Sequence, residues 1–379
     1  MKKSCYLALA LLVAVSLLLL TVGQAQAITS KKCWLCHTMH NSQDNDSMML
    51  LYRDSEAGTG GDLPSGALIR FVGCAGCHIA GEAGADTVID DTPIVYHVGG
   101  YPTANVLAGG NFYYGTIDPA RVHNCKGVAP LEAMAPPGFV TAQRPAAFPG
   151  AGAWGPPTWT SQTVDTQLTC AGEYGCHGDR STGNDDFAGV HGAHHANADL
   201  GTNQDCDGGT VADSYRFLAG IKGVEQNNGL LDSWERQASA SKHNGYYGVA
   251  RGVDTDVTAT ISYLCAQCHG NFHSDAGITN QAPPSSPWIR HPTDIAFSQA
   301  VGTEFAAYTT YDPVVPVGWR PGEITGGDPT NGMPTDPVVL CVSCHRAHGS
   351  EDKDLIRWGY NDGVDQPATQ SCRTCHTAK

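Results

Sequence analysis

Cys341-Val-Ser-Cys344-His345 is one of five copies of the pattern C-x-x-C-H in a chain of 379 residues. The other copies are Cys33-Trp-Leu-Cys36-His37, Cys74-Ala-Gly-Cys77-His78, Cys265-Ala-Gln-Cys268-His269 and Cys372-Arg-Thr-Cys375-His376. Two cysteines followed directly by a histidine are the pattern at which haem c is attached. The cysteine sulfurs form two thioether bonds, and the histidine binds the iron from below. The five copies therefore predict five covalent haems.

Disulfides and structural zinc are the alternatives for a chain with 15 cysteines. Exported proteins rich in cysteine usually form disulfides, and paired cysteines also bind structural zinc. Neither gives a reason for a histidine directly after the second cysteine in every copy. The repeated histidine favours haem.

A sixth, less regular site is Cys170-Ala-Gly-Glu-Tyr-Gly-Cys176-His177, with five residues between its cysteines. We expect Gly172 and Gly175 to let this longer loop fold back, so that both sulfurs reach one porphyrin edge. The alternative is a structural disulfide beside an unrelated histidine. Six haems leave Cys125 and Cys206, for which a disulfide is the plain expectation.

The supply of histidines indicates how the irons are ligated. Six of the 16 histidines follow the cysteines directly, at His37, His78, His177, His269, His345 and His376. The ten others are His40, His97, His123, His191, His194, His195, His243, His273, His291 and His348. Since six irons need only six more ligands, bis-histidine ligation throughout is the economical prediction, and it favours electron transfer over catalysis at an open iron.

Some of these histidines lie at helical spacing from a haem-binding one. His40 and His348 follow His37 and His345 by three residues, and His273 follows His269 by four. Residues three or four apart share a helix face. Such a turn could offer its first histidine to its own haem and its second to a neighbouring haem.

The N-terminus predicts export. Met1-Lys2-Lys3 precedes an apolar run from Leu7 to Val22, and Ala25-Gln26-Ala27 supplies small residues for cleavage. This is the pattern of a signal peptide over residues 1–27, with a single membrane anchor as the alternative. The formal net charge of −15 is the wrong sign for a nucleic-acid binder.

Composition argues against extensive regular structure, since the chain has 45 Gly and 22 Pro. We expect mostly coil with short helices and few strands, in an elongated multihaem cytochrome c wrapped round a haem chain. Residues 28–379 read as a single domain. Amphipathic helical periodicity is clearest near Ser214 to Lys222 and Ser233 to Lys242, and first helical turns are also expected to start at the Cys-His pairs. A short strand is expected over Val253 to Ser262. Tetrapyrrole planes, more than aliphatic side chains, are expected to form the core.

The sequence resembles the OmcS-type extracellular hexahaem cytochromes of iron-reducing bacteria, which polymerise into conducting filaments. The likeness lies in Cys33 to Asn41, Tyr96-His97, His123-Asn124, Arg290-His291-Pro292, Cys341 to Gly349 and the final C-x-x-C-H. The Cys170 region departs from that pattern, because its next histidines are only His191, His194 and His195. The resemblance implies that His40 ligates a haem of the next subunit. It also implies that His97, His123, His291 and His348 are distal ligands. Two further candidates for distal ligands are His194 and His243.

The sequence is compatible with three functions. The favoured one is an extracellular cytochrome that assembles head to tail with copies of itself. It would pass electrons to other multihaem cytochromes or to external acceptors such as insoluble metal oxides. The second is a monomeric periplasmic electron carrier. The third is a reductase of a small oxyanion such as nitrite, which the surplus of histidines and the absence of any C-x-x-C-K motif disfavour.

Overall fold

The structure is a computed structural model. It describes residues 42–43, 46–47, 73–80, 87–89, 92–100, 107–129, 131, 136–139, 167–182, 189–190, 193, 204–225, 243–273, 291–299, 304–323, 332–359 and 372–376. Most of these residues form turns, bends and irregular chain, with short helices and strands between them. The expectation of mostly coil is confirmed.

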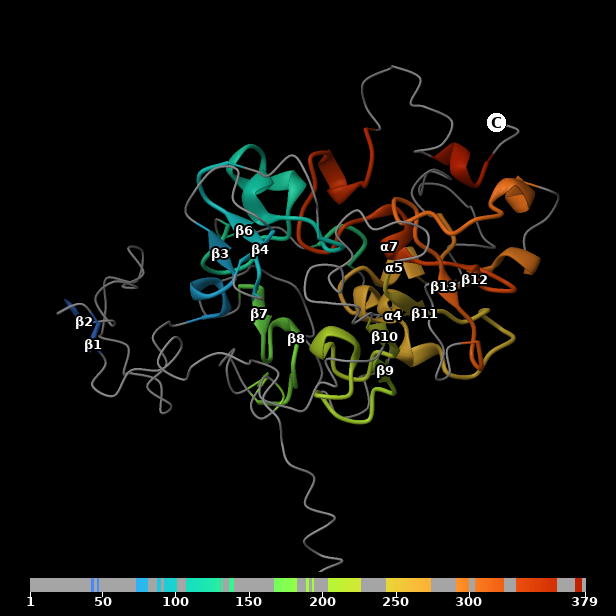
Figure 1. Ribbon diagram of the computed structural model, residues 1–379, viewed down its shortest axis with the longest axis horizontal. Helices are drawn as coiled ribbons and strands as arrows, with labels where there is room; N and C mark the ends of the chain where they lie inside the picture. Colours follow the sequence, from blue (N-terminus) through green and yellow to red (C-terminus); the bar gives the residue numbers. More distant parts are fainter. Residues whose placement is uncertain are drawn as a thin grey trace, which may run out of the picture.

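The strands are two or three residues long. They are β1 (Ser42–Gln43), β2 (Asp46–Ser47), β3 (Ile79–Ala80), β4 (Val88–Ile89), β5 (Thr92–Pro93), β6 (Tyr96–His97), β7 (Thr169–Ala171), β8 (Gly175–His177), β9 (Gln204–Cys206), β10 (Gly223–Glu225), β11 (Gly245–Tyr247), β12 (Ile295–Ala296), β13 (Gly318–Trp319) and β14 (Val338–Val339). One sheet has the order β12-β14-β13-β11-β10-β9, in which β11 and β13 are parallel. The parallel pairs β3–β6 and β7–β8 lie apart from it (Figure 1).

The helices are equally brief. The α-helices are α4 (Ile261–Ala266), α5 (Gly270–His273) and α7 (Cys341–Cys344). The 3-10 helices are η2 (Cys74–Gly76), η3 (Phe112–Thr116), η4 (Pro119–Arg121), η6 (Tyr215–Phe217), η7 (Val257–Ala259), η9 (Phe297–Gln299), η10 (Glu304–Ala307), η12 (Lys353–Leu355) and η13 (Cys372–Thr374). Asn111 and Asp118 begin η3 and η4 by accepting from backbone N–H groups. Among the described residues, no helix is long and apolar enough to cross a membrane.

One expectation about local structure is wrong. Val253 to Ser262 forms η7 and the start of α4 instead of a strand, because the Thr260 side chain accepts from Tyr263 N and begins the helix there. Ser214 to Lys222 contains a short helix as expected, η6, in which Arg216 has φ 50° and interrupts the helix. The region Ser233 to Lys242 lies outside the described residues.

Protein side chains form clusters of their own, in addition to any haem. The largest cluster lies on the six-stranded sheet and includes Tyr246, Val338 and Leu340. Cys206 belongs to this cluster, whereas Cys125 is buried in a second one with Phe112 and Tyr114. The structure does not contain the expected disulfide between Cys125 and Cys206, which belong to different clusters.

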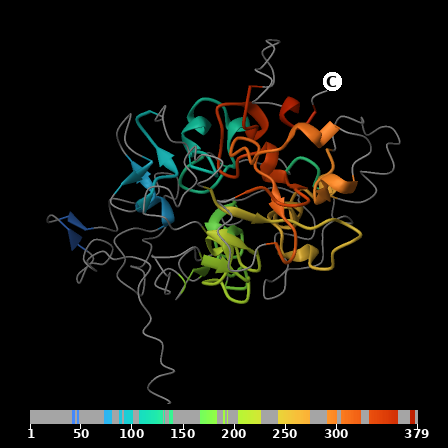
Figure 2. The same cartoon turned by 45° about the vertical axis from the view of Figure 1, so that its right-hand side comes forward.

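Two segments far apart in the sequence lie side by side. Residues 107–123 run beside residues 345–353 in both Figure 1 and Figure 2. Gly349 bridges to both Gly110 and Val122, and Asn111 N donates to Gly349 O at 3.1 Å. This contact brings His123 beside His348, because His123 N donates to His348 O at 3.2 Å.

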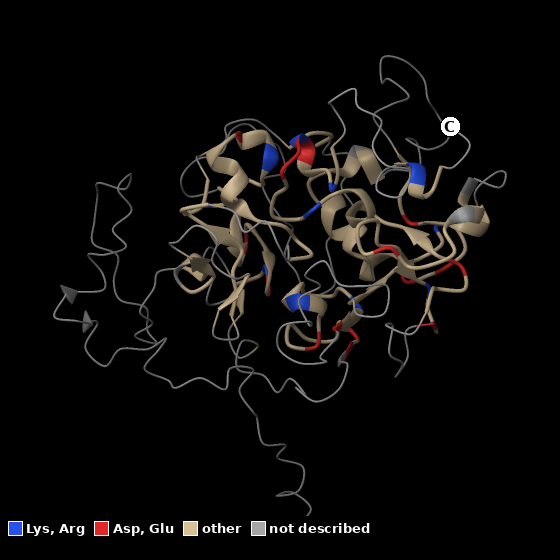
Figure 3. Ribbon diagram, turned by 45° about the horizontal axis from the view of Figure 1, so that its top comes forward, with Lys and Arg blue, Asp and Glu red and all other residues tan. Residues whose placement is uncertain are grey.

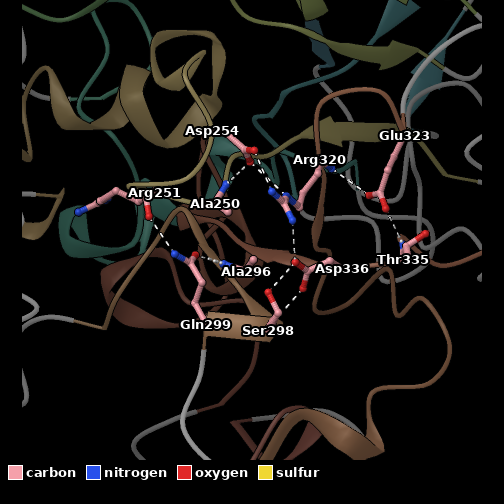
Figure 4. A network of polar contacts seen from close by, with 10 residues as sticks. All are labelled: Ala250, Arg251, Asp254, Ala296, Ser298, Gln299, Arg320, Glu323, Thr335 and Asp336. Carbon is pink, nitrogen blue, oxygen red and sulfur yellow. Dashed lines mark hydrogen bonds and ion pairs between the residues drawn. The ribbon is translucent and has the colours of Figure 1, made fainter.

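Charged side chains mostly join loops to one another. Arg320 bridges Asp254 at 2.8 Å and Asp336 at 3.0 Å, while Ser298 N donates to Asp336 at 2.9 Å (Figure 4). This network ties together the loops after β11, β12, β13 and before β14. Over the described residues as a whole, Lys and Arg are scattered among the acidic residues and do not gather in one patch (Figure 3).

Candidate haem sites

We name each site by its first cysteine. Four of the regular motifs fall within the described residues, and they share one backbone turn. In each motif the histidine N–H donates to the carbonyl of the first cysteine, at 3.0 Å in the Cys74 site, 2.9 Å in the Cys265 site, 3.0 Å in the Cys341 site and 2.8 Å in the Cys372 site. The turn therefore spans the cysteines and ends at the histidine. This differs from the expectation that the first helical turn starts at the Cys-His pair. It places both sulfurs and the imidazole on one side of the chain.

The irregular Cys170 site reaches a similar arrangement by strand pairing. Parallel strands β7 and β8 pair Thr169 with Gly175 and Ala171 with His177, so Cys170 lies opposite Cys176 in the register. Gly172 has φ 81°, and a Cβ at Gly175 would lie 2.3 Å from the Ala171 backbone. The two glycines therefore permit the fold-back that the longer loop needs.

Most described histidines use Nδ1 in the same way. In seven of them, Nδ1 lies within hydrogen-bond distance of a backbone carbonyl. The pairs are His78 with Pro93 at 2.8 Å, His123 with Ala347 at 2.6 Å, His177 with Arg216 at 2.8 Å, His243 with Asn244 at 2.7 Å, His269 with Pro137 at 2.7 Å, His291 with Pro292 at 3.0 Å and His345 with Asp354 at 2.7 Å. A carbonyl can only accept, so Nδ1 carries the proton in each case. This is the tautomer that binds a metal through Nε2.

Three pairs of histidine rings approach each other at nearly the same distance, with their planes 48°, 43° and 68° from parallel. The centroids are 6.1 Å apart for His123 and His269, 6.2 Å for His177 and His348, and 6.0 Å for His291 and His376. Metal–imidazole bonds are about 2.0–2.1 Å long, which places two imidazoles on opposite sides of one metal with centroids roughly 6 Å apart. The spacing fits one iron between the rings of each pair.

The protein surroundings favour the neutral form of His123, His177, His269 and His348. Loss of hydration lowers the pKa of His123 and His177. Loss of hydration, and then the neighbouring His177, lowers the pKa of His348 to about 3. Loss of hydration, and then the neighbouring His123, lowers the pKa of His269 to about 4. A neutral imidazole is the form that a metal binds.

The Cys372 site has an apolar pocket between its facing rings. Cys372, Cys375 and the rings of His291 and His376 line it, together with Phe305, Val315, Val317, Val339, Ser343, Cys344 and Trp358. Both sulfurs and both imidazoles thus open onto one hydrophobic space. This donor set and lining fit haem c at this site.

Three other histidines are not members of these facing pairs. His97 Nδ1 faces the amide nitrogen of Asn111 at 2.8 Å, while the Asn111 oxygen accepts from the N–H groups of His97 and Tyr113. His243 is fully buried and stacks on Tyr311 with centroids 3.5 Å apart. His273 Nε2 is bonded to Asp294 Oδ2 at 2.7 Å, so the helical spacing from His269 does not present it as a ligand. The sequence offered no signal for the Asn111 or Asp294 contacts.

Cysteines of different sites act on one another. A hydrogen bond between Cys265 and Cys341 raises the pKa of Cys265 and lowers that of Cys341. Burial, followed by the sulfurs of Cys375 and Cys372, raises the pKa of Cys344 to about 12. Cys176 adds to the effect on Cys265. The Cys170, Cys265, Cys341 and Cys372 sites therefore adjoin one another in chain order.

Several candidate residues lie outside the described residues. They are Cys33, Cys36, His37 and His40 of the first site, and His191, His194 and His195 after the Cys170 site. The signal peptide lies outside as well. These assignments stay predictions.

Comparison with known proteins adds one match within the chain. A family model for the doubled CXXCH motif matches residues 336–379, which contain the Cys341 and Cys372 sites. Among curated proteins no match is found. The chain is also similar to the solved outer membrane cytochrome S filament from Geobacter sulfurreducens, with 18% identity and a TM-score of 0.41 over 88% of this chain and 84% of that one. A cryo-electron microscopy structure of OmcS nanowires from Geobacter sulfurreducens gives 18% identity and a TM-score of 0.37, over 87% and 84%. The family match supports haem c attachment at the two C-terminal sites.

Proposed function

We propose that this chain is a multihaem c-type cytochrome that carries electrons along a row of bis-histidine haems. The observation that carries the proposal is the set of three facing histidine pairs, each with one ring from a Cys-His motif and one from a distant segment. Haem c supplies reversible one-electron chemistry when bound. At each of these three sites two cysteines and two histidines would hold the haem, and with both histidines bound no position would be left for a substrate.

The facing pairs give three proposed axial assignments. His123 is the distal ligand at the Cys265 site, His348 at the Cys170 site and His291 at the Cys372 site. All three assignments join a residue that the family resemblance implied as a distal ligand to a particular iron. The assignment of His348 to the Cys170 site supports a haem there, since a disulfide between Cys170 and Cys176 would need no second histidine.

Position supports two further assignments. His243 stacks on Tyr311, whose cluster also contains Cys344, so His243 is proposed for the Cys341 site. His97 pairs with Ala80 across β3 and β6, close to His78, so His97 is proposed for the Cys74 site, where it would bind iron through Nε2 only after the ring changes the tautomer that the Asn111 amide now holds. With the Cys33 site these make six haems in all, held by motifs present in the sequence.

The proximity of the sites supports a continuous path for electrons. A hydrogen bond joins Cys265 to Cys341, Cys176 lies near enough to raise the pKa of Cys265, and Cys375 and Cys372 lie near enough to raise that of Cys344. His78 lies near enough to lower the pKa of His348, after burial, His177 and His123. Each site in the described part of the chain therefore has at least one neighbour. An electron entering at one end can leave at the other without crossing a wide insulating gap.

We further propose that the chain is exported and assembles head to tail outside the cell. The signal-like N-terminus supports export, and the surplus of histidines leaves His40 available to a neighbouring subunit. His40 is the thirteenth residue of the expected mature chain, which begins at Ile28, on a segment that His37 would hold at the first haem. A head-to-tail contact that does not close into a ring produces a filament. Other multihaem cytochromes and metal oxides are the proposed electron partners.

Two measurements on the secreted protein test the electron-transfer proposal. The mass of the denatured chain should include six haems, and electron paramagnetic resonance should show only low-spin ferric iron. Five haems would assign Cys170 and Cys176 another role. One stoichiometric high-spin iron in the intact assembly would favour the reductase instead.

Assembly has a separate test in His40→Ala. This variant should keep all its haems, lose filaments in negative-stain images and gain one high-spin iron per chain. His273→Ala is the matched control, because Asp294 already occupies the Nε2 of that histidine. Normal filaments with every iron low-spin in His40→Ala would contradict ligation between subunits.

A further inference from the structure

A buried tyrosine lies flat against the histidine proposed for the Cys341 site. The ring centroids of His243 and Tyr311 are 3.5 Å apart, and the ring planes are 8° from parallel. Tyr311 is the largest fully buried side chain among the described residues, and His243 is also fully buried. Carbon atoms in van der Waals contact are about 3.5–4.0 Å apart, so the two rings overlap almost completely. The phenol ring therefore covers one whole face of the imidazole.

Three other candidate ligands have aromatic neighbours that lie farther away and are more tilted. The pairs are Phe112 with His348 at 5.1 Å and 28°, Phe272 with His269 at 6.2 Å and 32°, and Phe305 with His376 at 5.6 Å and 48°. At these distances and angles the rings do not overlap face to face. The contact at His243 is therefore of a different kind, and its closeness calls for a role of its own.

The hydrogen bond of His243 does not tie its ring to another part of the chain. Its Nδ1 lies 2.7 Å from Asn244 O, the carbonyl of the next residue. That bond selects the tautomer, but it moves with the same stretch of backbone as the ring. His345, the other histidine proposed at this iron, differs because its Nδ1 lies 2.7 Å from Asp354 O, nine residues away. The stack on Tyr311 gives His243 a comparable link to a distant segment.

Tyr311 is itself held by a closed turn. The Tyr308 hydroxyl donates to Val315 O at 2.7 Å and accepts from Asp312 N at 3.0 Å, and Val315 N donates to Asp312 O at 3.0 Å. Tyr308 and Val315 lie in the same buried cluster as Tyr311, and Cys344 packs against that cluster. The turn therefore gives the Tyr311 ring a fixed place beside this haem-binding cysteine.

We propose that Tyr311 is the positioning residue for the distal ligand of the Cys341 haem, because its ring fixes the plane of the His243 imidazole. This inference rests on the proposed function. An imidazole bound to iron through Nε2 can still turn about the iron–nitrogen bond, and a flat ring stacked on one face resists that turn. Partners of this kind orient the ligands of a metal and tune its properties. Since the planes of the two axial imidazoles affect the g values of a low-spin ferric haem, Tyr311 sets the resonance signal of one haem.

The ring face and the hydroxyl can be tested separately at Tyr311. Tyr311→Phe keeps the stacked ring, whereas Tyr311→Leu keeps an apolar side chain and loses the ring face. In electron paramagnetic resonance of the ferric holoprotein, Tyr311→Leu should show only low-spin iron, with changed g values for one haem at the wild-type haem mass. Tyr311→Phe should keep the wild-type g values. Tyr247→Leu is the matched control and should also keep them, since Tyr247 is a buried tyrosine in a cluster with Val249 and Ala259 that contains no cysteine.

His243→Ala supplies the second arm. It should give one high-spin iron at the wild-type haem mass, because it removes the ligand that Tyr311 positions. The inference is overturned if Tyr311→Leu keeps every wild-type g value, if Tyr311→Phe changes them as much as Tyr311→Leu, or if His243→Ala stays entirely low-spin. If Tyr311→Leu does not assemble, Tyr311→Met takes its place under the same criteria. Missing haems or high-spin iron in the wild type would count against the proposed function instead.

Discussion

The imidazole rings of His177 and His348 face each other with centroids 6.2 Å apart and planes 43° from parallel. His177 belongs to the irregular Cys170 motif, and His348 lies three residues after the regular motif at Cys341. Their separation matches the 6.1 Å and 6.0 Å of the pairs at regular sites. The irregular motif therefore has the same kind of facing histidine as the regular ones.

Removing His348 should open one iron while leaving every thioether bond intact. We expect His348→Ala to have the wild-type haem mass, one new high-spin ferric signal and one ferrous haem that binds carbon monoxide. His273→Ala is the control and should bind no carbon monoxide, because its Nε2 is already bonded to Asp294. An entirely low-spin His348→Ala would remove His348 from the ligand set.

Gly109 should act as a positioning residue for His348. A Cβ at Gly109 would lie 2.8 Å from His348 Nδ1, and Gly109 O accepts from His348 N at 2.6 Å. Gly109→Ala is expected to push the ring away and to give a fraction of high-spin iron at an unchanged haem mass. Gly332→Ala is the matched substitution, since a Cβ there meets nothing within 4 Å. Identical spectra for the two variants would contradict this role.

Gly175→Ala should destabilise the Cys170 site. The added Cβ would lie 2.3 Å from the Ala171 backbone, which cannot move without separating β7 from β8. Overpacking of this kind costs about 1–3 kcal/mol. The thermal unfolding midpoint should fall in Gly175→Ala and stay near wild type in Gly332→Ala. An unchanged midpoint in Gly175→Ala would contradict this prediction, because it would mean that the loop between β7 and β8 accommodates the added methyl group.

Acid should convert low-spin irons to high-spin ones. The folded-state pKa values of about 3 for His348 and about 4 for His269 lie below the ordinary 6.5, so the unfolded chain binds more protons than the folded chain. This contribution to stability is complete above pH 6.5 and is lost as the pH falls toward 3. Iron binding requires the same neutral rings and acts in the same direction. An optical acid titration should show the low-spin spectrum decreasing over this range, and a spectrum that weakens above pH 7 instead would contradict the sign.

The haem attachments could be predicted from sequence because their chemistry is local. Two sulfurs and one imidazole must lie within a single turn, so their spacing is fixed along the chain. The Cys170 site could also be suggested, since Gly172 and Gly175 signal a tight loop. The pairing of β7 with β8 could not be predicted, because the two strands are too short to produce a periodic pattern.

The distal ligands could not be matched to irons from sequence. His123 and His269 lie far apart in the sequence, and no local pattern encodes their approach. Helical spacing was misleading at His273, where a buried carboxylate takes the ring. Likewise, counting leftover cysteines suggested a bond between Cys125 and Cys206, although the fold buries them in separate clusters.

The carbonyls that accept from Nδ1 belong to residues as different as Pro93, Arg216, Asn244 and Asp354. Because the acceptor is always the main chain, the side chain at each of these positions is not needed to choose the imidazole tautomer. Such positions can change in evolution while the ligand field at the iron is retained. Proteins built this way would then keep a common backbone path after their loop sequences have diverged.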